Sequence, residues 1–252
     1  MEYIDVNTMI GKWPFRKLGT TGADELFREL GRVGIKRAIV SSFRSQRINI
    51  FTGNEELFQT AEKFEGMIPC PEIVPLINGE QGYANTVAYL EYLRGRGAGF
   101  VRITPKYNGF SATAKYFDET LAYLERYRMP LLVKVNDLDR GKDDVERICE
   151  KHPDLRLIVL NHDHENSRGI YFLLQNYPNL YFETSFLSEM DEIESIVGAV
   201  GSRGLLLGTR MPFMEPGRMV GRMAYSPISY EDKCAICFKN AEKLIDEAGK
   251  EC

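Results

Sequence analysis

Histidine changes its charge near neutral pH more readily than other side chains, and this chain has only three. His162 and His164 follow the apolar run Leu155–Leu160, whereas His152 stands before Pro153 at the expected end of a helix. A cation at a helix C-terminus is favoured by the helix dipole, so we interpret His152 as structural. His162 and His164 are then the candidates for a general base. Three histidines are too few for a histidine-rich metal site.

Basic side chains stand at the ends of other apolar runs. Arg102, Lys134 and Arg210 each lie within or just after such a run, and the loop at residues 11–16 adds Trp13 and Arg16. Guanidinium groups bind carboxylates and phosphates with two parallel hydrogen bonds, and clustered cations attract anions electrostatically. If the fold brings these residues together, they form a binding site for a small anionic molecule.

The apolar runs that would position these residues are eight in number. Each is nearly continuous in Val, Ile, Leu or aromatic residues, which is typical of parallel strands buried on both faces. We expect strands at Tyr3–Val6, Arg37–Val40, Ile73–Ile77, Gly99–Ile103, Pro130–Val133, Leu155–Leu160, Leu180–Phe182 and Gly204–Leu207.

Amphipathic stretches with helical spacing separate the runs. We expect helices at Asp24–Val33, Asn54–Phe64, Ala84–Leu93, Tyr116–Tyr127, Asp143–Glu150, Gly169–Asn176, Glu189–Val197 and Tyr230–Ala248. Eight alternating units in 252 residues predict an α/β fold, a (β/α)8 TIM barrel in a single domain over residues 1–252. An open doubly wound sheet is the alternative, but it usually carries a glycine-rich phosphate turn that this sequence lacks.

The composition limits the kinds of partner that the protein is expected to bind. The chain has 32 Lys and Arg against 36 Asp and Glu, a net charge of -4, which argues against a nucleic-acid binder. We see no apolar run long enough to cross a bilayer and no signal-peptide pattern at the N-terminus. The odd count of five cysteines is typical of reduced thiols, so we expect a cytoplasmic protein. Assembly into a homo-oligomer is left open.

Six strand-end motifs, in order along the whole chain, resemble those of the amidohydrolase-related family, metal-dependent hydrolases and decarboxylases on a distorted (β/α)8 barrel. Family members begin with I-D-x-H-x-H, where this chain reads I-D-V-N-T-M from Ile4. The family's eighth strand reads L-L-F-G-[ST]-D-x-P-F, and the matching segment here ends in Gly208, Thr209 and Arg210 before Met211-Pro212-Phe213. The other matching segments are Pro130–Lys134, Leu157–His162, Asn179–Ser185 and Lys239–Leu244.

The resemblance also identifies where this chain departs from the family. The positions that hold the family's metal are occupied here by Asn7, Met9, Lys134, His162 and Arg210. Only His162 is a good ligand, and two fixed cations would repel a divalent ion. We therefore expect a degenerate metal site, with neither a metal nor another cofactor, in which organic cations stabilise a developing oxyanion.

Two function classes follow. The first is an amidohydrolase-like, metal-independent hydrolase of a small carboxylated substrate, a lactone being one case, at the C-terminal mouth of the barrel. His162, Lys134 and Asn7 would be catalytic, with Lys134 the second candidate for the base or a Schiff-base former. The substrate would be bound by Arg102, Arg210, His164, Arg16 and Trp13.

The second class is a non-catalytic barrel that binds an anionic metabolite. For either function class, some of these residues could instead have a purely structural role, in two ways. Lys134 and Arg210 could form ion pairs with Glu183 and Asp163, and Asn7 and Met9 could merely fill a dead site. A residual metal held through His162 and His164, with Asp163 and Glu183, is a further alternative.

Overall fold

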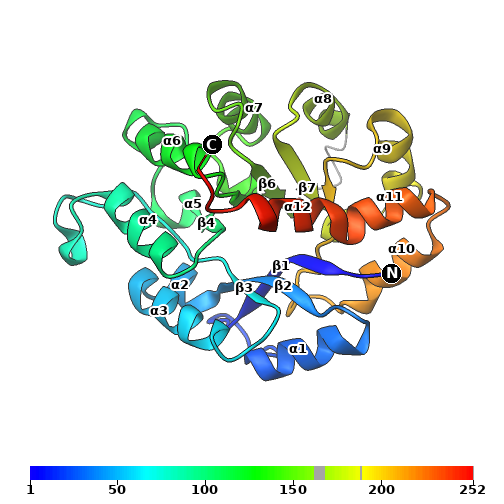
Figure 1. The fold of residues 1–252 in the computed structure, drawn as a ribbon, viewed down its shortest axis with the longest axis horizontal. Helices are drawn as coiled ribbons and strands as arrows, with labels where there is room; N and C mark the ends of the chain where they lie inside the picture. Colours follow the sequence, from blue (N-terminus) through cyan, green and yellow to red (C-terminus); the bar gives the residue numbers. More distant parts are fainter. Residues whose placement is uncertain (162–167, 188, 252) are drawn as a thin grey trace.

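The computed structural model describes residues 1–161, 168–187 and 189–251. Strands and helices alternate around a closed barrel, with the helices outside (Figure 1). The eight strands are β1 (Ile4–Ile10), β2 (Arg37–Ser42), β3 (Met67–Pro69), β4 (Val101–Ile103), β5 (Leu131–Lys134), β6 (Leu157–Leu160), β7 (Leu180–Glu183) and β8 (Leu205–Leu206).

All strand pairs are parallel and form two ladders, β1-β2-β3 and β4-β5-β6-β7-β8. Backbone contacts on two sides join the ladders into a ring. The amide of Val6 donates to the carbonyl of Leu207 at 2.9 Å, which places β1 beside β8. On the other side Glu72 forms an isolated bridge with Arg102, which joins the segment after β3 to β4.

The helices on the outside follow the expected order. The long helices are α1 (Ala23–Arg32), α3 (Ile50–Ala61), α4 (Thr86–Gly95), α6 (Asp118–Arg126), α7 (Lys142–Lys151), α8 (Arg168–Asn176), α9 (Glu192–Val200) and α10 (Gly217–Tyr225). The C-terminal segment is α11 (Tyr230–Cys234), a π-helical turn (Ala235–Lys239) and α12 (Asn240–Glu247). Among the described helices, none has both the length and the apolar character to cross a membrane.

Among the described residues, three α-helices were not predicted. Two are short and follow strands directly: α2 (Phe43–Arg47) after β2, and α5 (Pro105–Asn108) after β4. The third is α10, which precedes the C-terminal segment. A single turn of helix has too few positions to show a periodic apolar pattern, so α2 and α5 gave no signal in the sequence.

The predicted third strand was wrong. β3 occupies Met67–Pro69, and the expected run Ile73–Ile77 lies beyond it. Pro75 has no amide hydrogen for a ladder, and Ile77 is 78% exposed, as an inner strand residue would not be. Asn78, which follows this run, is exposed as well. The apolar run is therefore a loop segment that is anchored to β4 only at its beginning.

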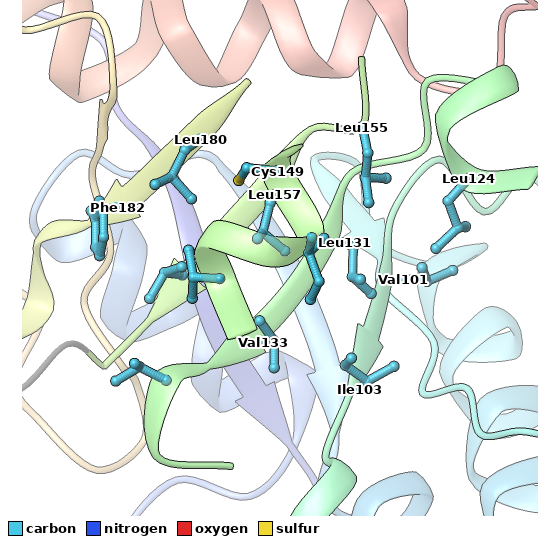
Figure 2. Packing of buried hydrophobic residues seen from close by; sticks show 14 of the residues in the cluster. Val101, Ile103, Leu124, Leu131, Val133, Cys149, Leu155, Leu157, Leu180 and Phe182 are labelled. Carbon is cyan, nitrogen blue, oxygen red and sulfur yellow. The ribbon is translucent and has the colours of Figure 1, made fainter. Parts of the chain in front are cut away.

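The core has two main layers. In the outer layer, alternate residues of β4 to β7 pack against Leu124 of α6 and Cys149 of α7 (Figure 2). The inner layer fills the barrel with the other strand faces and includes Leu132, and Ala241 and Leu244 of α12 pack against its amino end. The carboxyl ends of the strands are therefore left for polar side chains.

Candidate functional site

Strand alternation directs two of the predicted cations into the barrel. Val101 and Ile103 belong to the outer layer, so Arg102 between them faces inward. Arg102 is paired in register with Leu132, an inner-layer residue of β5. Lys134 lies two residues after Leu132 on the same face. Arg102 and Lys134 thus stand at the carboxyl end of the barrel interior, as expected.

Arg102 is the largest fully buried side chain, with 1% of its surface exposed. Its Nε and Nη2 atoms are buried and have no hydrogen-bond partner among the described residues. Burial lowers the pKa of Arg102 from its ordinary value, because a guanidinium loses its hydration there. A buried cation with unsatisfied N–H groups is costly, and an anionic ligand would satisfy it.

Arg210 follows β8 and adopts a left-handed backbone conformation with a φ of 60°. Its guanidinium lies over two aromatic rings, 4.5 Å from the centroid of Phe186 and 5.2 Å from that of Phe213. Cation–π contacts of this kind hold a guanidinium in place without using its hydrogen-bond donors. The Nε atom of Arg210 is buried and has no partner among the described residues.

Arg47, at the end of α2, is a fourth cation that the sequence did not reveal. Its guanidinium lies 4.1 Å from the ring centroid of Tyr107 and 5.4 Å from that of Trp13. The hydroxyl of Tyr107 also donates to the backbone carbonyl of Arg47 at 3.2 Å. The Nε atom of Arg47 is buried without a partner among the described residues.

The pKa of Lys134 is affected by the charges of the other three cations. It is lowered to about 8, first by burial and then by the positive charges of Arg102, Arg47 and Arg210, with Asp137 opposing the shift. Like charges at short range disfavour the protonated amine. Arg102, Arg47 and Arg210 are therefore all within electrostatic reach of Lys134.

Asp5 has a structural role at the start of the barrel. It is fully buried, and its carboxylate accepts hydrogen bonds from the backbone amides of Asn7 and Thr209, both at 3.0 Å, and from the hydroxyl of Thr209. Burial raises the pKa of Asp5 to about 6, although these hydrogen bonds oppose the shift. Both oxygens are occupied, so Asp5 is a tie between β1 and the segment after β8.

Glu183 is also fully buried and fully occupied. Its Oε1 accepts from the amide of Asn161 at 2.7 Å and from the hydroxyl of Ser185 at 2.7 Å, and its Oε2 accepts from the amide of Ser185 at 2.9 Å. The carboxylate thus holds the ends of β6 and β7 together. Among the described residues it forms no ion pair within 4.0 Å with Lys134 or Arg210, although its negative charge favours the charged form of Arg210 and opposes the lowering of that residue's pKa by burial.

Asn7 and Met9, the two positions of β1 that match ligands of the family's metal, are both buried. A bulge shifts the register between Asp5 and Thr8, so strict alternation does not run through this strand. Asn7 donates to the side-chain carbonyl of Asn161 at 2.9 Å. Met9 packs with Leu18 and Phe43 in a small apolar cluster. The catalytic role predicted for Asn7 stays a prediction.

The other predicted site residues differ in their placement. Trp13 packs against Phe43 and Phe213, with ring centroids 5.0 and 5.2 Å away, and lies near Arg47. Arg16 is exposed. His162 and His164 lie outside the described residues, as does Asp163, so their predicted roles stay predictions.

The donor set does not fit a divalent metal ion. The four described positions that match the family's ligands carry an amide, a thioether, an ammonium and a guanidinium, which are poor or repulsive partners for zinc. Within residues 1–161, 168–187 and 189–251, no three His, Cys, Asp or Glu side chains are grouped closely enough to hold a metal. Glu183, part of the residual-metal alternative, already has its carboxylate occupied.

Solved structures match this fold closely. An uncharacterised TIM-barrel protein from Bordetella bronchiseptica has a TM-score of 0.80 at 16% identity, over 99% of this chain and 100% of the other. The 2,6-dihydroxybenzoate decarboxylase from Rhizobium has 0.76 at 12%, over 97% and 98%. The 5-carboxyvanillate decarboxylase from Sphingomonas paucimobilis has 0.76 at 11%, over 97% and 99%.

Sequence comparisons find no such similarity: no family model and no curated protein matches the chain. At 11–16% identity, the structural matches establish the fold alone. That fold is the TIM barrel of amidohydrolase-type proteins over nearly the whole chain, as the strand-end motifs predicted.

Proposed function

We propose that this protein is an enzyme that hydrolyses a small carboxylated substrate at the carboxyl ends of its barrel strands, without a metal ion. The observation that carries the proposal is the group of four cations, Arg47, Arg102, Lys134 and Arg210. Three of them have buried N–H groups without a partner among the described residues. Leaving such donors unsatisfied costs free energy, which a bound carboxylate would recover.

The aromatic residues around the cations favour an aromatic or other planar carboxylate. Tyr107 and Trp13 flank Arg47, and Phe186 and Phe213 flank Arg210. Two proteins of the same fold are named as decarboxylases of aromatic acids, 2,6-dihydroxybenzoate and 5-carboxyvanillate. Both considerations support an aromatic or other planar carboxylate as the substrate. The proposed reaction is hydrolysis of a lactone or a similar ester of this class.

In the proposed reaction, fixed side-chain cations supply the positive charge that a metal ion would otherwise supply. They bind the substrate carboxylate and stabilise the oxyanion that forms when water attacks the carbonyl carbon. Lys134, whose pKa is about 8, holds a substantial neutral fraction near that pH and can accept a proton from the attacking water. His162 is the other predicted base and lies outside the described residues.

Binding and turnover test the proposal together. Calorimetric titration with benzoate and phthalate should show binding that Arg210→Ala weakens by about tenfold or more, the usual cost of a charge-assisted contact. Arg28→Ala is the matched control, because Arg28 is an exposed arginine of α1. Carboxylated lactones should be hydrolysed with release of a proton, followed with an indicator dye. Absence of carboxylate binding by the unaltered protein would refute the proposal.

A binding protein without catalysis is the second candidate. The full occupation of Asp5 and Glu183 by structural hydrogen bonds favours it, since neither carboxylate is free to activate water. Tight binding of carboxylates with no hydrolysis of any carboxylated lactone would support this candidate. His162→Ala separates the two further, because loss of a general base lowers turnover by about 100-fold or more and leaves anion binding intact.

A further inference from the structure

Glu72 lies beside Arg102 at the junction of the two strand ladders. The two residues form the isolated bridge between the segment after β3 and β4. Asn54 of α3 fixes the backbone of Glu72 from behind: its side chain donates to the Glu72 carbonyl at 2.7 Å and accepts from the Glu72 amide at 3.0 Å. The position of Glu72 in the barrel is therefore rigidly set.

The carboxyl group of Glu72 is only half satisfied. Oε1 accepts a hydrogen bond from the hydroxyl of Thr104, whereas Oε2 is buried and has no partner among the described residues. The side chain is 1% exposed. Asp5 and Glu183 have both oxygens hydrogen-bonded, whereas Oε2 of Glu72 has no hydrogen bond of ordinary geometry among the described residues, although the Gln46 side chain lies close enough to lower the pKa of Glu72. The neighbouring Arg102 likewise keeps two donors free.

The surroundings of Glu72 favour a readily exchanged proton. Burial raises its pKa to about 7, while the hydroxyl of Thr104 and the charge of Arg102 oppose the shift and Asp137 adds to it. Cys70 also lies within electrostatic reach, and burial raises the pKa of its thiol to about 12, so the thiol stays neutral. A carboxyl in this setting can both hold and release a proton near neutral pH.

We propose that Glu72 is the proton carrier of the site: it takes up a proton when an anion binds to Arg102 and donates that proton from Oε2 to the bound ligand. This inference rests on the proposed function. An anion beside Arg102 reduces the positive potential at Glu72, and the neutral acid then becomes the favoured form. In lactone hydrolysis the recipient is the leaving oxygen.

The transfer balances without any further reactant. The Oε2–H bond breaks, its electron pair stays on Oε2, and the proton forms a new bond to the leaving oxygen of the ligand. The resulting carboxylate is stabilised by Thr104 and Arg102. After the product has left, the next anion to bind draws a proton from solvent.

Proton uptake on anion binding tests this role. Calorimetric titration of benzoate at pH 7, in two buffers of different ionisation enthalpy, measures the number of protons taken up. We expect uptake by the unaltered protein and its loss in Glu72→Gln, with benzoate still bound. Lys134 also takes up a proton, but mainly near and above pH 8, so uptake at pH 7 reports chiefly on Glu72. Lys63→Met, at an exposed lysine, is the control and should keep the uptake.

A second variant keeps the test decisive if Glu72→Gln does not fold. Thr104→Val removes the hydrogen bond that lowers the pKa of Glu72, so the pH at which uptake is half-maximal should move upward. Unchanged uptake in Glu72→Gln, or an unmoved midpoint in Thr104→Val, would overturn the role of Glu72 and leave the proposed function standing. A protein that binds no carboxylate at all would remove both.

Discussion

Asp5 and Thr209 join the first strand of the barrel to the segment after the last one. Both the amide and the hydroxyl of Thr209 donate to the two carboxylate oxygens of Asp5, and all of these atoms are buried. β1 and β8 are not paired in one continuous ladder, so this side-chain tie supplements the few backbone bonds between them. Closure of the barrel at its carboxyl end thus combines this side-chain contact with the backbone hydrogen bond from the Met9 amide to the Met211 carbonyl at 2.9 Å.

Removal of the Thr209 hydroxyl should weaken this closure. Thr209→Val keeps the shape of the side chain but leaves one oxygen of Asp5 without a donor, which costs about 1–3 kcal/mol. Thr209→Ser retains the hydroxyl and is the matched control. Urea unfolding at pH 7 should rank the unaltered protein first, the serine variant second and the valine variant last. Equal stability of the two variants would show that the hydroxyl contributes nothing.

Gly208 should be essential for the placement of Glu183. A Cβ atom at this position would collide with Oε2 of Glu183 and come within 3.3 Å of the Cβ of Asn7. Gly208→Ala should therefore destabilise the protein by about 1–3 kcal/mol, the usual cost of overpacking a core. Gly221→Ala in α10 is the control, since a Cβ there meets no atom within 4 Å. Helix propensity makes that control neutral or more stable by up to about 1 kcal/mol.

The barrel could be predicted from the sequence because its strands are nearly continuous apolar runs, as at β5 and β6. The end of each run then indicated Arg102, Lys134 and Arg210 as residues of the barrel mouth, and their roles there stay predictions. The third strand was predicted wrongly, because the most apolar segment in its region, Ile73–Ile77, contains Pro75 and ends at the surface.

Arg47 and Glu72 could not be found in the same way. Arg47 stands at the end of the single-turn helix α2, and its place beside Lys134 depends on contacts with Tyr107 and Trp13. Glu72 is buried, and its position is set by Asn54, which is 18 residues away in the chain. Such properties arise from packing between distant segments, which no local pattern records.

Replacement of Arg102 together with Glu72 should stabilise the protein while removing its affinity for anions. The buried guanidinium has two unsatisfied donors, and an apolar side chain of similar length avoids that cost. Arg102→Met combined with Glu72→Gln removes both buried charges and is expected to raise the free energy of unfolding by about 1–4 kcal/mol, whereas Arg102→Met alone leaves the Glu72 carboxyl without its positive neighbour. Benzoate binding, measured by calorimetry, should be lost. A destabilised variant that still binds benzoate would show that Arg102 is structural.

Glu72 should make a pH-dependent contribution to stability. Its pKa in the folded protein is about 7, above the ordinary value near 4.3, so the folded state binds this proton more tightly. The contribution is fully present below about pH 4 and is lost as the pH rises through 7. Glu72→Gln cannot lose a proton, so its stability relative to the unaltered protein should increase between pH 5 and pH 8. Urea unfolding at both pH values measures this difference, and a constant difference would contradict a titrating Glu72.

Lys134 should limit anion binding at high pH. Its pKa is lowered to about 8, so the amine loses its charge between pH 7 and pH 9 while benzoate stays ionised. If binding requires the charged amine, affinity should fall about tenfold over this range, because a single linked proton is involved. Lys134→Met should bind benzoate weakly at pH 7 and show no further fall. The exposed Lys63, replaced in the same way, is the control. An equal fall in the Lys134→Met variant would assign the titration to another group, and Lys134 would then be no part of the anion site.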